Sequence, residues 1–311
     1  MKRIVIGADG GGTKTALCAV DMDSKSILTQ CVCEGINLFS VGLDEALNTL
    51  CQGIKKLGIA TPYAISLGDP SLDDSCDNSK APLMSALQEI FPNTLVFSKS
   101  DVFMALYAHT QGKEGAMLVS GTCSMGIAFT SPETPDKDPE VITVGGRGFP
   151  TNDPGSAYSI AINGISLALM AFDGMASSTE LCQRLLDYFS LSDHKMLTEL
   201  FNSDPPSHKE LSGFAREVAY AAESQDRGAM SVLQRATEDL RLHAVSLLRA
   251  LPGDKRDLAL SGSVLKNNTF VRQGLLKALQ KDFPEAKLSL LDKSPQWGAA
   301  IYAINKIGEA K

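Results

Sequence analysis

The sequence predicts an α/β fold built from two related halves. Near the start of the chain an apolar strand runs through a glycine loop into a second strand, "IVIGADGGGTKTALCAVD", over residues 4–21. The same order of strand, glycine turn and strand returns in "GAMLVSGTCSMGIAFT", over residues 115–130. Stretches with apolar residues three and four positions apart alternate with the strands, as is typical of helices. Two such openings, each followed by further strands and helices, favour two copies of one α/β unit.

The first half is expected to begin with an antiparallel meander of three strands that ends near residue 33. A helix then covers residues 40–58, where Leu43, Leu50 and Ile54 recur at helical spacing. The remaining elements of this half are a strand at 63–68, a helix at 81–91, a strand within 92–101 and a helix at 102–109.

The second half begins with the two strands of residues 115–130, after which "TSPETPDKDPE" is expected to form an exposed hairpin tip. Most of the chain after this tip is predicted to be helical, with a break at "SQDRG", residues 224–228. "RDLALSGSVLKNN", residues 256–268, is expected to be a strand that runs into a Gly-Ser turn. The expected helices cover 155–172, 179–189, 208–224, 229–251 and 297–307.

The composition fits a globular enzyme without nucleic-acid or membrane partners. The 311 residues are 44% hydrophobic, and 29 Lys+Arg against 36 Asp+Glu give a formal charge of -7. No basic run follows the chain, which disfavours nucleic acid and anionic membranes. The longest apolar stretch has about eight residues, where a bilayer span needs roughly 20. The N-terminus lacks the apolar core of a secretory signal, so we expect a cytoplasmic protein.

The cysteines are predicted to be free thiols in a reducing compartment, because their number, seven, is odd and they are scattered. Cys31 and Cys33 come nearest to a metal signature. No second Cys or His pair at zinc spacing accompanies them, which favours a structural role.

The first glycine loop has the chemistry of a phosphate-binding site. Consecutive glycines let backbone N–H groups approach an anion, and threonine hydroxyls add donors. The loop runs on into a strand instead of a helix, which excludes a Walker A loop and a dinucleotide fingerprint. A plain hairpin turn is the alternative. The residues concerned are Gly7, Gly10, Gly11, Gly12, Thr13, Lys14 and Thr15.

Asp9 lies in the same loop, where phosphates would repel its carboxylate unless a cation lay between them. Mg²⁺ takes one or two carboxylates together with phosphate oxygens, so a single Asp suits it. An Asp that only forms a turn is the alternative. "VSGTCSMG", residues 119–126, repeats the loop chemistry, so the two loops are expected to hold one polyphosphate.

Five motifs carry a family resemblance. "GADGGGTKT", "VSGTCSMG" and "LALSGSVLKNN" resemble the first phosphate, second phosphate and adenosine motifs of the sugar kinase/actin/Hsp70 superfamily. "GGRGFPTNDPGSAYSIA" and "SKSDVFMAL" resemble the N-acetylglucosamine kinase branch, which is grouped with the BadF/BadG/BcrA/BcrD ATPases. The similarity spans nearly the whole chain in collinear order.

The resemblance implies two ribonuclease-H-like (actin-like ATPase) domains with an interdomain cleft for ATP and sugar. The smaller domain is expected over 1–113, with a helix of about 296–311 packed back on it, and the larger over 114–311 with a helical insertion. It also implies ATP and Mg²⁺ as cofactors, a homodimer, and phosphorylation of an amino sugar. N-acetylglucosamine, or a relative such as glucosamine or N-acetylmuramate, is the implied substrate.

The resemblance also implies the roles of single residues. Asp101 matches the catalytic base, which touches the substrate hydroxyl; a helix N-cap is the alternative for this residue. Asn37 and Asp153 match residues that bind sugar hydroxyls, and Gly146 and Arg147 lie in the sugar-binding "GGRG" stretch. An ordinary strand-to-helix turn is the alternative for the adenosine loop. The ATP-binding positions are Gly10, Gly11, Gly12, Thr13, Lys14, Gly121, Thr122, Gly262, Ser263, Lys266 and Asn267, and the metal position is Asp9.

The chain departs from the family pattern in its sugar pocket. Arg147 stands where many of these kinases have an aromatic residue, and Pro154 stands where they have an acidic one. An Arg pairs well with a carboxylate, such as that of a lactyl-bearing sugar, which points to N-acetylmuramate. Cys123 occupies a loop position that often holds Gly, where it is expected to crowd the phosphate slightly.

Two other function classes are weighed against the kinase. One is an ATPase switch of the BadF/BadG type, which needs paired cysteines at a subunit interface to hold an iron–sulfur cluster. The sequence has no matching cysteine arrangement. The other is a sugar sensor joined to a DNA-binding module, which the acidic charge disfavours, as does a first strand expected at the start of the chain.

Overall fold

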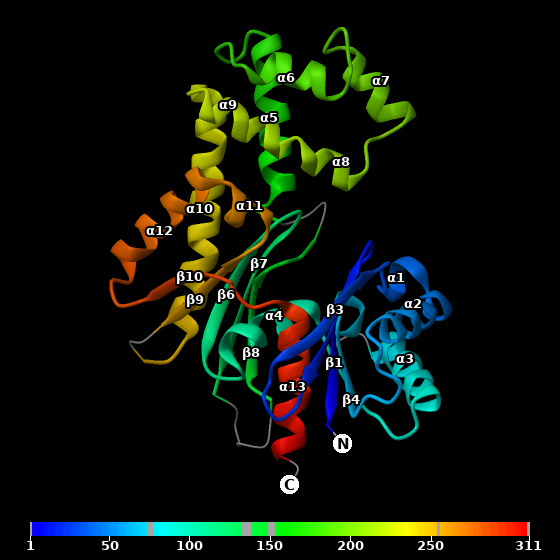
Figure 1. Cartoon of the computed structure of the whole chain (residues 1–311). Coiled ribbons are helices and arrows are strands. Elements are labelled where there is room, and N and C mark those ends of the chain that lie inside the picture. The colour runs from blue at the N-terminus through cyan, green and yellow to red at the C-terminus, as the bar shows by residue number, and fades with distance from the viewer. Residues whose placement is uncertain (1, 74–76, 132–137, 149–152, 254–255, 310–311) are drawn as a thin grey trace. The chain divides into compact units, whose positions relative to one another are not determined.

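Two five-stranded sheets with the same strand order organise the chain (Figure 1). The computed structural model describes residues 2–73, 77–131, 138–148, 153–253 and 256–309. Each sheet belongs mainly to one of two compact units. The first unit comprises Met1–Glu114, Phe129–Glu140 and Leu291–Lys311, and the second comprises Gly115–Ala128 and Val141–Leu290.

The sheet of the first unit has the order β3-β2-β1-β4-β5. The first three strands pair antiparallel as the predicted meander, and β4 and β5 extend the sheet parallel to β1. The strands are β1 (Ile4–Asp9), β2 (Thr15–Asp21), β3 (Ile27–Cys33), β4 (Ala64–Gly68) and β5 (Leu95–Lys99). The helices are α1 (Leu38–Val41), α2 (Leu43–Lys56), the 3-10 helix η1 (Pro70–Leu72), α3 (Asp77–Ile90), α4 (Asp101–Thr110) and α13 (Pro295–Glu309).

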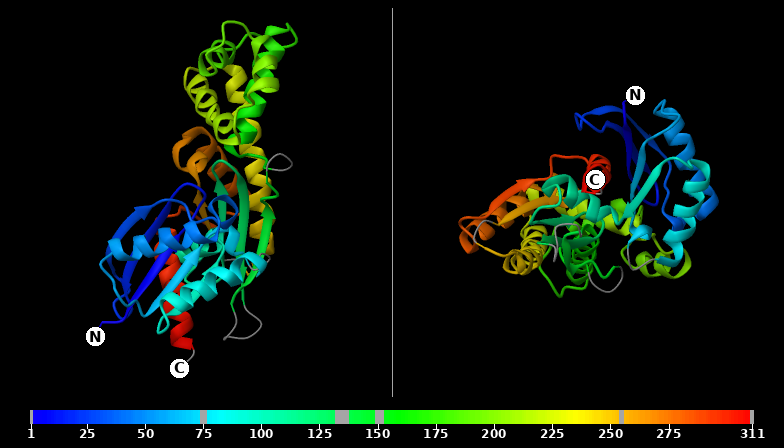
Figure 2. Two further views of the ribbon diagram at one scale, coloured as in Figure 1. Left: turned by 90° about the vertical axis from the view of Figure 1, so that its right-hand side faces the viewer. Right: turned by 90° about the horizontal axis from the view of Figure 1, so that it is seen from below.

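Helices cover both faces of this sheet, which is why its central strand β1 is apolar (Figure 2). Helices α2 and α3 fill the core on one face, and α13 packs on β1, β4 and α4 on the other. A Cβ on Gly7 would stand 1.9 Å from the backbone oxygen of Gln296 in α13. Gly7 therefore lies within β1 and permits helix packing, and its assignment to the phosphate loop was wrong.

The second unit repeats the strand order as β8-β7-β6-β9-β10, with β6 in the place of β1. Strands β9 and β10 extend it parallel to β6. The strands are β6 (Gly115–Ser120), β7 (Ser124–Thr130), β8 (Glu140–Gly145), β9 (Asp257–Ser261) and β10 (Lys287–Leu290). The predicted α/β fold of two related halves is confirmed.

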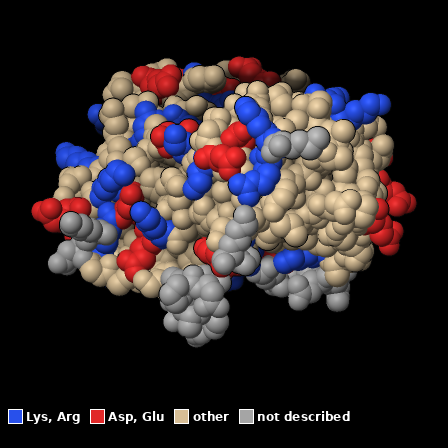
Figure 3. Space-filling model, turned by 60° about the horizontal axis from the view of Figure 1, so that its bottom comes forward, with Lys and Arg blue, Asp and Glu red and all other residues tan. Residues whose placement is uncertain are grey.

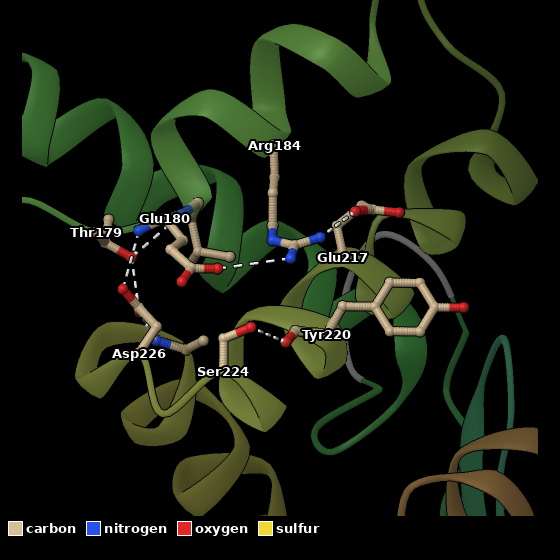
Figure 4. Close-up of polar contacts among 9 residues, drawn as sticks. Thr179, Glu180, Arg184, Glu217, Tyr220, Ser224 and Asp226 are labelled. Carbon is tan, nitrogen blue, oxygen red and sulfur yellow. Dashed lines mark hydrogen bonds and ion pairs between the residues drawn. The ribbon is translucent and has the colours of Figure 1, made fainter.

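Most of the helices of the second unit lie beyond one end of its strands (Figures 1 and 2). The longest described helix of this unit, α10, runs along the sheet and begins after Asp226, whose Oδ1 accepts a hydrogen bond from the backbone N–H of Ala229 at 2.8 Å. The same carboxylate accepts from Thr179 Oγ1 at 2.7 Å and from the Glu180 backbone at 2.9 Å, before α6 (Figure 4). The predicted break at 224–228 is thus a capped junction that ties two helices together. The helices are α5 (Ala157–Phe172), α6 (Leu181–Tyr188), α7 (Met196–Ser203), α8 (His208–Gly213), α9 (Ala215–Glu223), α10 (Arg227–Ala250), α11 (Ser263–Asn267) and α12 (Thr269–Asp282).

The structure differs from the sequence prediction in its smaller elements. The predicted helix over 40–58 is divided at Gly42, where φ is +78°, into α1 and α2. Strands β8 and β10 and helices α7 and α12 were not expected; the two strands are only partly buried and lack a continuous apolar run. Most of the predicted hairpin tip lies outside the described residues.

Charge is mixed on the face drawn in Figure 3, where Lys and Arg side chains stand among Asp and Glu. No single-sign patch of the kind that binds nucleic acid covers that face. Within the described ranges, no helix has both the length and the apolarity needed to cross a membrane.

Candidate active site

Three aspartates follow adjacent strands at one edge of the first unit's sheet. Asp9 ends β1 and pairs in register with Gly68 of β4, which in turn pairs with Lys99 of β5. Asp69 comes directly after Gly68, and Asp101 comes two residues after Lys99. The carboxyl ends of parallel strands meet at this edge, where α/β proteins bind their ligands.

The first glycine loop packs tightly at its start. A Cβ on Gly10 would stand 2.6 Å from the Ile36 side chain and 2.9 Å from Oδ2 of Asp69. Gly35, which the sequence reading did not single out, comes equally close, because its Cβ would stand 2.5 Å from the backbone oxygen of Gly12. The fold itself therefore requires glycine at positions 10 and 35.

Gly11 and Gly12 are different, because packing does not require them to be glycine. A Cβ on Gly11 would have the Lys14 backbone oxygen as its nearest atom, at 3.5 Å. A Cβ on Gly12 would meet only the Ser40 side chain, at 3.3 Å. Neither glycine has a positive φ. Their bare backbone is left open for a ligand, which fits an anion cradle.

The three residues after these glycines differ in how far their side chains are exposed to solvent. Thr13 and Lys14 are exposed at the loop, in reach of solvent and ligand. Thr15 is fully buried within β2. Its hydroxyl has no hydrogen-bond partner among the described residues, so its role as a donor to a ligand stays a prediction.

Asp101 is the first residue of α4, and the N-cap of that helix is Ser100, whose side chain accepts from the Phe103 backbone at 3.4 Å. The alternative reading of Asp101 as the cap is excluded by this geometry. The pKa of the Asp101 carboxyl is raised to about 6, mainly by burial. The negative charges of Asp69 and Asp73 contribute to the rise, and the hydrogen bond from the Val102 N–H opposes it. A carboxyl with a pKa just below neutral suits a general base.

Asn37 is buried and hydrogen-bonded to the aspartate that sequence reasoning missed. Its Nδ2 donates to Asp69 Oδ1 at 2.8 Å, and its Oδ1 accepts from Ser40 Oγ at 3.3 Å. The backbone N–H groups of Ile36 and Asn37 donate to Gly11 O at 3.1 and 3.4 Å. Asn37, Asp101 and the first loop therefore share one edge of the sheet. Asp69, in "LGDPS", was not singled out from the sequence, although its place after a strand matches that of Asp9.

Two of the predicted ATP-binding loops lie side by side within the second unit. Gly262 has φ +90°, and a Cβ on it would stand 2.2 Å from the Ser120 backbone oxygen and 2.8 Å from the Gly121 backbone nitrogen. A Cβ on Gly121 would meet the Ser263 backbone at 3.6 Å. Only glycine fits at position 262, so this turn is specified more tightly than an ordinary strand-to-helix turn. Thr122, Ser263, Lys266 and Asn267 are exposed around it.

Asp153 is buried beside the second loop. Ser120 Oγ and Ser124 Oγ donate to the backbone oxygens of Gly155 and Pro154, each at 2.8 Å, which fixes this segment against β6 and β7. Neither carboxylate oxygen of Asp153 has a hydrogen-bond partner among the described residues. The Cys123 thiol beside it is only a weak donor, so this buried carboxylate is costly unless a ligand supplies further donors, as sugar hydroxyls would.

Two titratable side chains, His243 and Cys123, lie close enough to the Asp153 carboxylate to interact with it electrostatically. His243 of α10 is buried, and a Cβ on Gly145 would stand 2.7 Å from its Nε2. Burial lowers the pKa of His243, so the imidazole is neutral at pH 7. Cys123 is exposed at the loop, yet partial desolvation and the charge of Asp153 raise the pKa of its thiol to about 11, so the thiol is protonated at neutral pH and a poor nucleophile.

Gly146 and Arg147 follow β8 and are exposed. Gly146 has φ +66°, and a Cβ on it would stand 2.8 Å from the Met125 side chain, so the turn needs glycine. Arg147 makes no hydrogen bond or ion pair with another described residue, which leaves its guanidinium available.

The residues present fit ATP and a magnesium ion. The open backbone at Gly11 and Gly12 offers N–H donors to phosphates. In the part of the chain that the structure describes, no group of three His, Cys, Asp or Glu side chains is placed to hold a metal by itself. Mg²⁺ bound through phosphate oxygens needs only one or two carboxylates, and Asp9 at the end of β1 is one.

Comparisons with known proteins agree with this arrangement. A curated N-acetylmuramic acid/N-acetylglucosamine kinase from Clostridium acetobutylicum is 26% identical, over 97% of this chain and 98% of the relative. An N-acetyl-D-glucosamine kinase from Dictyostelium discoideum is 27% identical, over 98% of both chains. The crystal structure of a candidate N-acetylglucosamine kinase from Chromobacterium violaceum matches with a TM-score of 0.75 and 25% identity, over 97% of this chain and 99% of that one. The model of the BadF/BadG/BcrA/BcrD ATPase family matches residues 6–303, and the chain belongs to that family.

Proposed function

We propose that the protein is an ATP-dependent amino-sugar kinase, which transfers the γ-phosphoryl group of ATP to a hydroxyl of N-acetylglucosamine or of a close relative. The observation that carries the proposal is the set of groups that meet at the carboxyl-terminal edge of the first unit's sheet. There a carboxyl of raised pKa, Asp101, shares its surroundings with an oriented amide, Asn37, and with a bare glycine loop. The names of the curated relatives supply the substrate class.

Asp101 acts in this proposal as the general base. Its ionised carboxylate accepts the proton of the attacking sugar hydroxyl while that oxygen bonds to the γ-phosphorus and the bond to the ADP oxygen breaks. A pKa near 6 leaves the group mostly ionised at neutral pH, yet more basic than an ordinary Asp. Asn37 and Asp153 bind sugar hydroxyls; an amide both donates and accepts, and a carboxylate accepts.

The phosphates are assigned to the glycine loops. Backbone N–H groups of Gly11 and Gly12, with Thr13 and Lys14, take one part of the triphosphate, and Gly121 and Thr122 take another. The N–H of Gly10 already donates to Gly68 O at 2.7 Å, so this glycine supports the loop by packing. The adenosine is assigned to Gly262, Ser263, Lys266 and Asn267. Asp9 holds Mg²⁺, which when bound neutralises charge on the phosphate oxygens.

The phosphate assignment predicts that Gly11→Ala weakens ATP binding without weakening the fold. The structure has room for the methyl group, so unfolding should change by less than about 1 kcal/mol. A phosphate held against the backbone has no such room, and the Kd for Mg-ATP should rise about tenfold or more. Calorimetric titration and thermal unfolding measure the two effects. Gly308→Ala, in α13 with open space around it, is the matched control. Unchanged ATP affinity would remove the first loop from the site.

Arg147 supports a substrate that bears a carboxylate, and N-acetylmuramate is the one we propose beside N-acetylglucosamine. A bidentate Arg–carboxylate pair is a charge-assisted interaction that the neutral sugar cannot make. Arg147→Gln should therefore lower kcat/KM for N-acetylmuramate about tenfold or more and change that for N-acetylglucosamine by less than about twofold. Arg249→Gln, another exposed arginine, should change neither.

A panel assay tests the function itself. Purified protein with Mg-ATP is incubated with N-acetylglucosamine, glucosamine and N-acetylmuramate, and mass spectrometry detects the addition of a phosphoryl group. A phosphorylated amino sugar is the expected product. Turnover of the neutral sugars alone would refute the role of Arg147, and no phosphorylated sugar at all would refute the kinase.

The proposal extends to the setting of the enzyme. We take it to be a cytoplasmic homodimer whose partner is a small sugar. The cysteines that the structure describes are all free, as expected in a reducing compartment. The edge strand β3 exposes Ile27, Leu28 and Val32, which favours coverage by a second copy.

A further inference from the structure

Asp69 is the most deeply buried charged side chain at the edge of the first sheet that the proposed mechanism leaves unused. It is fully buried, and its Oδ1 accepts three hydrogen bonds: from Asn37 Nδ2 at 2.8 Å, from the Ser71 backbone at 2.8 Å and from Ser71 Oγ at 2.5 Å. Its Oδ2 has no partner among the described residues and lies against Gly10. A buried carboxylate costs free energy, so it needs an explanation.

Its role as a helix cap does not supply that explanation. Asp69 is the N-cap of η1, and capping requires only an oxygen for the Ser71 backbone N–H, which Ser or Asn offers as well as Asp. The bond to Asn37 is additional and joins segments 32 residues apart in the sequence.

The bond decides which way the amide of Asn37 faces. A carboxylate is acceptor-only, so it admits the NH₂ end of the amide and rejects the oxygen end. Ser40 Oγ fixes the other end by donating to the amide oxygen at 3.3 Å. One N–H hydrogen and one lone pair of Asn37 remain, in defined directions, for a ligand. Without an acceptor oxygen at this position, nothing would hold the NH₂ end, and the amide would be free to turn over.

We propose that Asp69 is a positioning residue for sugar recognition, which holds the amide of Asn37 in the one orientation that binds the sugar hydroxyl. The inference rests on the proposed kinase function. Asp69 lies one residue after β4, between β1, which ends at Asp9, and β5, which ends two residues before Asp101, so the amide is fixed relative to the base and the first loop at once. Pre-orientation of this kind lowers the cost of ordering the site when the sugar binds.

The test compares two replacements that keep the cap. Asp69→Ser keeps an oxygen for the Ser71 N–H but is too short to reach Asn37, whereas Asp69→Asn keeps an oxygen for both. Asp69→Ser should raise the KM for the sugar about tenfold or more and leave the KM for ATP within about twofold. Asp69→Asn should recover most of the sugar affinity. Calorimetric titration with the sugar gives the same ranking without turnover, and thermal unfolding checks that both variants fold.

A double-mutant cycle with Asn37→Ala separates positioning from general support of the fold. If Asp69 acts through Asn37, Asp69→Ser should add less than about twofold to the sugar KM once Asn37 is alanine. Additive effects, an ATP KM that rises equally, or an unchanged sugar KM in Asp69→Ser would each overturn the inference while the kinase stands. A wild-type protein that binds no amino sugar would instead overturn the proposed function, and this inference with it.

Discussion

Replacing Asp101 with asparagine is expected to lower kcat by roughly 10²–10⁴-fold, the usual contribution of a general base, with little change in ATP affinity. Asparagine has nearly the same shape but cannot take up the proton of the attacking hydroxyl. Asp44→Asn, which neutralises an exposed acid in the first turn of α2, is the matched control and should retain full activity. Steady-state kinetics with the best sugar of the panel provide the measurement. Activity within a few-fold of wild type would remove Asp101 from the chemistry.

The same replacement is expected to stabilise the fold at neutral pH. The folded-state pKa of Asp101 lies above its ordinary value of 3.8, at about 6, so the folded protein binds the proton more tightly than the unfolded chain does. The free energy of unfolding therefore falls as pH rises through this window. At pH 7.5 the ionised carboxylate costs about 2 kcal/mol, allowing for its partial exposure to solvent, and Asp101→Asn should recover that amount. At pH 3.5 the gain should vanish, because both states are then largely protonated.

The pH dependence of activity depends on the same group. A base must be ionised, so kcat/KM should fall as pH drops below about 6, by up to tenfold per pH unit. An acid limb near pH 4 would mean that the reaction relies on a carboxylate of ordinary pKa.

Gly262→Ala is expected to lower both the stability of the second unit and its affinity for ATP. Position 262 combines a left-handed φ of +90° with a Cβ site 2.2 Å from the Ser120 backbone oxygen, and a backbone atom cannot swing away as a side chain can. The strain and the displacement of β6 together should lower the free energy of unfolding by about 3 kcal/mol. The movement also reaches Gly121, so the Kd for ATP should rise about tenfold or more.

Gly174→Ala is the matched control for this prediction. Gly174 has φ +72° with open space around it, so alanine there carries only the conformational cost of about 1–2 kcal/mol. Its ATP affinity should equal that of wild type. Equal losses of stability in the two variants, with ATP binding intact in both, would show that the turn at Gly262 has no part in nucleotide binding.

The sequence predicted the strands of both sheets that are buried on two faces, because such strands must be continuously apolar. It also located the two glycine loops, which follow such strands directly, and Asp101, which comes two residues after the partly exposed strand β5. It could not distinguish Gly7 and Gly10, which serve packing, from Gly11 and Gly12, which packing leaves open. That distinction depends on which helix or side chain lies opposite, and the sequence of one strand does not contain it.

The sequence could not reveal residues whose contacts are with residues far away in the chain. Asp69 looks like a turn former until Asn37 is found against it, and His243 looks like one polar position on a long amphipathic helix until it is seen beside Gly145. Strands β8 and β10 were missed because their mixed patterns and partial burial gave no periodic signal.

An ATPase switch is the alternative to a kinase, and the dependence of ATP turnover on sugar separates the two functions. A switch would hydrolyse ATP at the same rate with no sugar present. A kinase with Asp101 as its base must instead keep water from the phosphorus until the sugar is bound.

ATP consumption by the purified protein, with and without amino sugar, is therefore the most direct test of the kinase. We predict that ADP forms in step with sugar phosphate, that ATP alone is turned over at least about 100-fold more slowly, and that Asp101→Asn abolishes the sugar-dependent part. Equal ATP turnover with and without sugar, unaffected by Asp101→Asn, would contradict the kinase.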